Sequence, residues 1–169
     1  MKTEKLIERL KAINIDFTKP TIVLSECLLV YLDKSSTIEV LKHINQSFKN
    51  VIFFLYDLIG PEDNFGKEME INLADRNIRI PGFEQVPNCE AQTNRLLKSD
   101  FQVAKVVDML DYYRHYVNKQ ELHRIEKLEF LDELEEFNLL QKHACFGVAL
   151  KIEDKNLEEI RSMIDLFSN

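Results

Sequence analysis

The stretch TIVLSECLLVYL, residues 21–32, decides the fold class of this chain. Its first four residues form a continuous run of apolar and β-branched side chains, which predicts a strand buried on both faces. A second such run, VIFFLYD at residues 51–57, predicts another buried strand. Between the two runs, Asp33, Ser35 and Ser36 are good helix N-cap residues, and an apolar stripe of helical spacing follows them. Strand, helix and strand with short connections predict a βαβ unit with parallel strands.

The segments on either side of this unit predict more helices and two more strands. An α/β domain of about four strands is therefore expected over residues 1–152, followed by a helical tail at 153–169. The acid-rich stretch 124–137 repeats apolar residues at three-residue steps, which predicts that much of it packs into the core. The expected helices are 3–13, 62–78, 89–98, 119–141 and 154–168, and the expected strands are 101–109 and 143–152.

The composition excludes several classes of protein. The chain has 29 acidic and 22 basic residues and a net charge of −7, which argues against a generic binder of the nucleic-acid backbone. Four glycines include no G-x-G, so a nucleotide-binding glycine loop is not encoded. Three cysteines without a C-x-x-C fit a reducing compartment, and the four histidines lack metal-ligand spacing. The N-terminus is no signal peptide, and a cytoplasmic protein without a metal site is expected.

Polar residues gather where the two predicted parallel strands end, and ligands bind at this edge of open α/β sheets. Glu26 interrupts an apolar run, where a charge is costly unless it has a partner. It either binds a cationic or nucleoside group, or it serves as an N-cap or buried ion-pair acceptor. Tyr31, Tyr56 and Asp57 are further candidates at this edge. The tyrosines could equally be half-buried packing residues, and Asp57 could cap a turn.

Together, several segments resemble the leucine carboxyl methyltransferases, which methylate the C-terminal leucine carboxylate of the protein phosphatase 2A catalytic subunit. That family is similar in fold to the class I S-adenosylmethionine-dependent methyltransferases, which have a Rossmann-like sheet. The resemblance implies that this chain is the C-terminal half, with strands four to seven of the family sheet and the last strand antiparallel. The segments, in order, are PTIVLSECLLVYL at 20–32, FFLYD at 53–57, DNFGKEM at 63–69, CEAQTNRLL at 89–97, VVDM at 106–109 and RIEKLEFLDELEE at 124–136.

The resemblance also implies site residues and partners. Glu26 would contact the cofactor S-adenosylmethionine, and Tyr31, Tyr56 and Asp57 would face the methyl-transfer cleft as substrate-binding residues. The substrate partner would be the phosphatase tail. No catalytic base is assigned, because an α-carboxylate is already ionised at neutral pH. A cation must hold that carboxylate, and the candidates by elimination are Arg76, Arg79 and Arg95.

The resemblance begins at the fourth strand of the family sheet, so the glycine loop and the ribose- and adenine-binding acids have no counterpart here. We therefore expect this chain alone to bind the cofactor poorly. An exposed sheet edge is also expected, which favours a homo-oligomer. Two alternatives remain open. One is a non-catalytic, protein-binding half-domain. The other is the sister branch that modifies a hypermodified guanosine (wybutosine) in transfer RNA, which the acidic charge disfavours.

Overall fold

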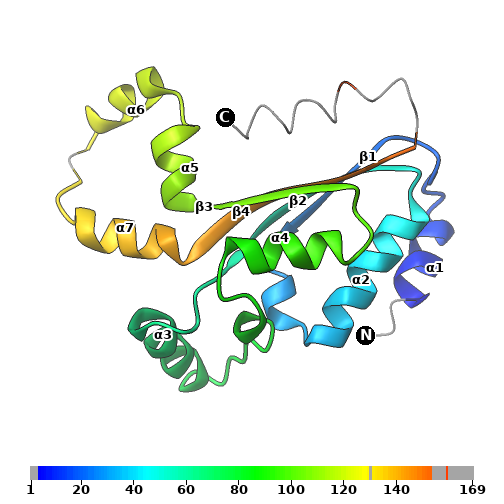
Figure 1. Cartoon of the computed structure of the whole chain (residues 1–169), viewed down its shortest axis with the longest axis horizontal. Coiled ribbons are helices and arrows are strands. Elements are labelled where there is room, and N and C mark those ends of the chain that lie inside the picture. Colours follow the sequence, from blue (N-terminus) through cyan, green and yellow to red (C-terminus); the bar gives the residue numbers. More distant parts are fainter. Residues whose placement is uncertain (1–3, 130, 154–158, 160–169) are drawn as a thin grey trace.

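A computed structural model describes residues 4–129, 131–153 and 159 of the chain (Figure 1). The described residues form helices and strands in mixed order, as expected for an α/β protein. The strands are β1 (Thr21–Glu26), β2 (Asn50–Leu58), β3 (Val103–Asp108) and β4 (Ala144–Ile152). The helices are α1 (Glu4–Ala12), α2 (Lys34–Ser47), α3 (Asn64–Ala74), α4 (Cys89–Leu97), α5 (Met109–His115), α6 (Lys119–Glu126) and α7 (Leu134–Lys142), with short 3₁₀ turns η1 (Leu29–Tyr31) and η2 (Phe83–Gln85).

The four strands form one mixed sheet in the order β1-β2-β4-β3. β1 and β2 are parallel, which confirms the predicted βαβ unit, and α2 begins where Asp33 accepts a hydrogen bond from the Ser36 amide. β4 runs antiparallel to both of its neighbours, β2 and β3. A sheet whose last strand is antiparallel agrees with the C-terminal half of a class I methyltransferase sheet. Within the described residues, no helix combines the length and apolar composition needed to cross a membrane.

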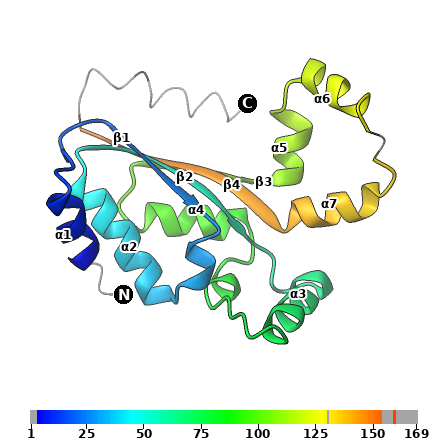
Figure 2. The ribbon, with the colours of Figure 1, turned by 180° about the vertical axis from the view of Figure 1, so that it is seen from behind.

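The core lies between the sheet and the three helices α1, α2 and α4, which all pack on the same face (Figures 1 and 2). Most strand residues that point to this face are apolar and buried, and so are many of the helix residues opposite them. Burial of such side chains supplies most of the stability of a domain of this size. They include Leu41, Phe53, Leu55, Leu96 and Ala149, each with 0% of its surface exposed.

The prediction that β1 is buried on both faces is wrong. Ile22 is 67% exposed and Leu24 is 66% exposed, although both lie in the middle of an apolar strand. The reason is the placement of the helices, since α1, α2 and α4 all cover the opposite face (Figure 2). The burial of β2 is intermediate, because its residues mostly alternate between buried and half-buried. An apolar run therefore predicted the strand, but not how many of its faces are covered.

The prediction of a single helix over residues 119–141 is also wrong. The chain forms α6 and α7 there, and α5 begins at Met109, the last residue of the strand expected at 101–109. The expected core packing fails as well, because four apolar residues of this segment are between 44% and 72% exposed. A three-residue step drifts around a 3.6-residue helix, so these residues do not stay on one face. The exposed residues are Ile125, Leu128, Leu131 and Leu134. The tail at 153–169 lies outside the described residues, apart from Glu153 and Glu159.

Candidate functional site

The carboxyl ends of β1 and β2 bring Glu26 beside Tyr56. The two residues are direct partners in the parallel register, and the amide of Cys27 donates a hydrogen bond of 2.8 Å to the Tyr56 carbonyl. Cys27 then adopts a φ of +44°, in the left-handed region that few residues other than glycine enter. This conformation ends β1 and directs the chain into η1. The side chains of Glu26 and Tyr56 therefore share one face at the edge where ligands bind in α/β sheets.

That shared face is the one the helices α1, α2 and α4 do not cover. Glu26 is exposed and Tyr56 is half-buried. Desolvation raises the pKa of the Tyr56 phenol, and the nearby Cys27, Cys145 and Glu26 groups act in the same direction. The phenol therefore stays protonated at neutral pH and can donate a hydrogen bond. An exposed carboxylate beside a phenol donor is able to bind a polar ligand.

Asp57 does not share that face. Successive strand residues point to opposite sides of a sheet, so Asp57 points toward the helices, where it is 1% exposed. Burial raises the pKa of its carboxyl group to about 6, although the Leu58 amide, the Arg95 guanidinium and the amides of Val30 and Leu29 act against this. Its hydrogen bond from the Leu58 amide is 3.1 Å long. Asp57 therefore lies under the Glu26 and Tyr56 edge, on the face of the sheet that the helices cover.

Arg95, the nearby cation, is one of the three arginines predicted as candidates to hold a substrate carboxylate. It lies on α4 and is only 9% exposed, and its three guanidinium nitrogens have no hydrogen-bond partner among the described residues. Burial lowers its pKa, while the charges of Asp57 and Cys145 raise it. The charge of Arg95 favours the ionised form of Asp57 beneath the sheet, although no hydrogen bond joins their side chains within the described residues. One feature of the sequence could have predicted that Arg95 is buried: it occupies one of the inward-facing positions of an amphipathic helix.

Tyr31 lies on η1, immediately after the turn at Cys27, and is 52% exposed. The loop before η2 packs directly against η1, because the Gly82 amide donates to the Val30 carbonyl at 2.8 Å. A Cβ atom at Gly82 would collide with the Leu29 carbonyl oxygen, so only glycine permits this approach. η1 is therefore held between the edge of the sheet and the loop that follows α3.

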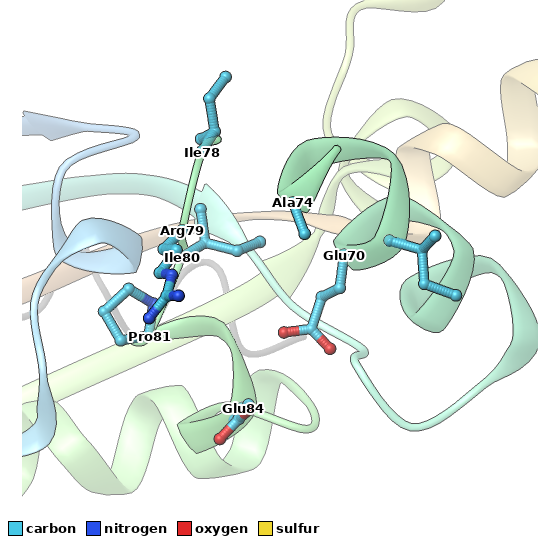
Figure 3. A pocket seen from close by; sticks show the side chains of 8 residues that line it. Glu70, Ala74, Ile78, Arg79, Ile80, Pro81 and Glu84 are labelled. Atoms are coloured by element: carbon cyan, nitrogen blue, oxygen red, sulfur yellow. The ribbon is translucent and has the colours of Figure 1, made fainter. Parts of the chain in front are cut away.

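A pocket between α3 and that loop was not anticipated from the sequence (Figure 3). It encloses about 420 Å³ and combines aliphatic walls with two carboxylates. Figure 3 shows the carboxylate of Glu70 pointing into the pocket, with Glu84 on the opposite wall. Desolvation raises the pKa of Glu70, and the charge of Glu84 raises it further. The pocket is lined by Glu70, Ile71, Ala74, Ile78, Arg79, Ile80, Pro81 and Glu84.

Neither metal nor thiol chemistry is evident in the described part of the chain. It contains no group of three or more histidine, cysteine or acidic side chains placed to hold a metal ion. Cys27, Cys89 and Cys145 are free thiols. Burial is the main cause that raises the pKa of each, to about 12 for Cys89, so these thiols are protonated at neutral pH.

No protein-family model matches this chain, but curated proteins do. Leucine carboxyl methyltransferase 1 homolog of Arabidopsis thaliana is 35% identical over 146 residues, which cover 86% of this chain and 44% of that protein. Leucine carboxyl methyltransferase 1 of Rattus norvegicus is 36% identical over 141 residues, with 83% and 42% covered. The tRNA wybutosine-synthesizing protein 4 of Rattus norvegicus is 33% identical over 140 residues, with 83% and 20% covered. The chain thus spans less than half the length of these relatives.

These similarities confirm the resemblance stated from the sequence motifs, since they extend over most of the chain. Among solved structures, phosphoethanolamine N-methyltransferase 2 of Haemonchus contortus in complex with S-adenosyl-L-methionine is also similar. Its TM-score is 0.45 at 16% identity, covering 87% of this chain and 40% of that one. A likeness of this size supports no conclusion about the site.

Proposed function

We propose that this chain, which is related over most of its length to the leucine carboxyl methyltransferases, is the C-terminal part of an S-adenosylmethionine-dependent carboxyl methyltransferase. The observation that supports it best is the pairing of Glu26 with Tyr56 on the open face of the sheet. This pair stands at the carboxyl edge of two parallel strands, where α/β proteins bind ligands.

The residues at this edge fit part of a cofactor site. The exposed carboxylate of Glu26 can accept hydrogen bonds from hydroxyl or ammonium groups, and S-adenosylmethionine carries both. When bound, this cofactor supplies the methyl group. The sequence has no G-x-G loop, so Glu26 would hold only one side of the cofactor. We therefore expect the isolated chain to bind it weakly.

For the substrate, we propose the C-terminal leucine carboxylate of the protein phosphatase 2A catalytic subunit. An α-carboxyl group has a pKa of about 3.5, so it is ionised at neutral pH and needs no general base. The protein's task is then to align the carboxylate and to exclude water. Tyr31 and Tyr56 carry phenol groups that can donate to a carboxylate at this edge. Asp57 would act as a positioning residue, because it is buried on the other face.

The transfer-RNA branch is the second candidate, and the 33% identity to tRNA wybutosine-synthesizing protein 4 favours it. The net charge of −7 favours a protein substrate, because nucleic-acid binding needs cationic surface. A protein with three free thiols also fits the reducing cytoplasm, which we propose as its location.

The function is tested with a fusion in which the amino-terminal segment of the Arabidopsis relative, up to the start of its similarity, precedes this chain. Methyl transfer from labelled cofactor is measured to a phosphatase tail peptide and, separately, to transfer RNA. We expect transfer to the peptide. Transfer to RNA alone would establish the sister branch, and transfer to neither would leave the non-catalytic protein-binding reading as the better one.

The role of Glu26 is tested in the same fusion by calorimetry. Glu26→Gln should weaken cofactor binding about tenfold, since a hydrogen bond to a charged group contributes roughly 1.5–3 kcal/mol. Glu39→Gln, which changes an exposed glutamate on α2, is the matched control and should bind normally. With the isolated 169-residue chain we expect no binding in the micromolar range. Micromolar affinity there would contradict the incomplete site.

A further inference from the structure

The pocket between α3 and the loop that follows it has walls that are fixed at both ends. α3 ends in a turn at Asn77, where φ is +60° and the Ile78 amide donates to the Leu73 carbonyl at 2.9 Å. Further along the loop, Ile80 is 6% exposed and packs in a core cluster with Phe83. The pocket is therefore preformed. Its volume of about 420 Å³ lies within the range of about 300–1,000 Å³ that is common for small-molecule sites.

Two carboxylates face this pocket without a cationic partner. Figure 3 shows the carboxylate of Glu70 pointing into the space, with Glu84 on the opposite wall. No ion pair in the described part of the chain includes either of them, although Arg79 lies on the loop wall of the same pocket. Desolvation and the charge of Glu84 both raise the pKa of Glu70. Two like charges that face one space repel each other, so a cation placed there would relieve the repulsion.

The other walls of the pocket are aliphatic and partly open to solvent. Ile71 is 54% exposed and Ile78 is 37% exposed, and Ala74 and Pro81 also line the space. A metal ion would need more oxygen ligands than two carboxylates, and the described residues hold no group of three or more placed for one. A hydrocarbon chain would cover the aliphatic walls, as a lysine stem does while its charged end stays at a polar group. The ligand that fits both features carries a positive charge at the end of a short hydrocarbon chain.

We propose that this pocket binds a primary ammonium group carried on an aliphatic chain. The ammonium would donate charge-assisted hydrogen bonds to the carboxylates of Glu70 and Glu84, and the chain would lie along the aliphatic walls. Two sources share this chemistry, namely a free alkylamine and a lysine side chain of a partner protein. Among the described residues that line the pocket, none belongs to the candidate methyl-transfer edge. The proposal therefore does not depend on the proposed function.

The test uses the isotope-labelled 169-residue chain and three probes of equal chain length, which are pentylamine, pentan-1-ol and pentanoate. Amide chemical shifts in NMR spectra measure binding residue by residue. We expect saturable shifts centred on residues 70–84 with pentylamine. Its dissociation constant should be at least tenfold lower than that of pentan-1-ol, because only the amine adds charge-assisted hydrogen bonds.

A short peptide with blocked ends and a single lysine distinguishes the two sources of the ammonium group. It is titrated in parallel with pentylamine and should shift the same amides. Tighter binding of the peptide than of pentylamine would identify a lysine of a partner protein as the ligand. Tighter binding of pentylamine would identify a free alkylamine.

Variants that remove one charge separate these two carboxylates from the rest of the acidic surface. Glu70→Gln should weaken pentylamine binding at least tenfold, since it keeps the shape of the side chain but removes its charge. Glu84→Gln should weaken it as well. Glu68→Gln is the matched control, because Glu68 is an exposed glutamate of the same helix that does not line the pocket. It should bind pentylamine normally, and all three variants should fold because none of these side chains is buried.

Four outcomes would overturn the proposal. The absence of saturable shifts at residues 70–84 would show that no ammonium group binds there. Equal affinity for pentylamine and pentan-1-ol would show that the pocket selects only for an apolar chain. Tighter binding of pentanoate, lost in Arg79→Gln, would make the pocket an anion site. Equal weakening by Glu70→Gln and Glu68→Gln would reduce the effect to general attraction by an acidic protein.

Discussion

The imidazole ring of His143 lies between the Asp63 carboxylate and the Leu139 carbonyl. Its Nε2 is 2.9 Å from Asp63 Oδ2, and its Nδ1 is 2.8 Å from the Leu139 oxygen. The carbonyl oxygen and the carboxylate are both hydrogen-bond acceptors, so the ring meets an acceptor at each of its nitrogens. The ring is 4% exposed and packs 4.3 Å from the ring of Phe65, measured between centroids. This contact attaches the start of α3 to the start of β4, and α3 forms one wall of the pocket in Figure 3.

Asp63 has two tasks that substitution can separate, since it also caps α3 by accepting from the Gly66 amide at 2.8 Å. Asp63→Asn keeps a capping side chain, whereas Asp63→Ala removes the cap and should cost about 1 kcal/mol more in the free energy of unfolding. Urea denaturation at pH 7 measures the difference. Equal stability of the two variants would show that the cap contributes nothing.

Asp63 also gives the chain an acid-sensitive contact. The Gly66 amide and then His143 hold its pKa below the ordinary value of 3.8. Its stabilising effect is therefore present above pH 3.8 and is lost as the pH falls through the lower pKa of the folded state. Asp63→Asn should remove this part of the acid sensitivity.

Asp57 should make the protein less stable as the pH rises from about 4 to 6. Its pKa is about 6 in the folded chain against 3.8 when exposed, so the folded state holds the proton longer. In this window the unfolded state gains charge first, and stability falls by about 3 kcal/mol before levelling off above pH 6. Denaturation of the protein and of Asp57→Asn at several pH values checks this. Parallel stability curves for the two would contradict it.

Gly82 should be intolerant of a side chain. In Gly82→Ala the new Cβ meets backbone atoms of η1, including the Val30 Cα at 2.9 Å, and backbone cannot move aside easily. We expect a loss of about 1–3 kcal/mol of stability. Gly147→Ala is the control, because its Cβ meets the Val106 Cγ2 methyl, a side-chain atom, at 2.8 Å. A cost for Gly147→Ala as large as that for Gly82→Ala would contradict the role given to the η1 contact.

Two leucines of neighbouring strands should respond differently to truncation. Leu55 on β2 is fully buried against the helices, so Leu55→Ala should cost about 2–5 kcal/mol. Leu24 on β1 is 66% exposed, so Leu24→Ala should change the stability of the isolated chain by about 0.5 kcal/mol or less. Thermal and urea denaturation of both variants test this. A large loss for Leu24→Ala would show that its face is covered in solution.

The sequence alone predicted the βαβ unit and the final strand, because those signals are local. Short apolar runs, the Asp33 cap and helical spacing act within a few residues, and the structure forms β1, α2, β2 and β4 accordingly. The motif resemblance was also a sequence result, and the similarity to curated relatives confirms it. Placing Glu26 and Tyr56 at one edge followed from the parallel pairing of their strands.

Only the tertiary structure decided which faces are covered and which charges meet. Tyr56 and Asp57 are consecutive, yet one points to the open face and the other to the core, because α1, α2 and α4 pack on only one side of β1 and β2. The same packing exposes Ile22, an apolar residue, and buries Arg95 near Asp57. The spacing of apolar residues predicts whether a segment forms a helix or a strand. Burial depends on what other segments pack against it, and no local pattern contains that information.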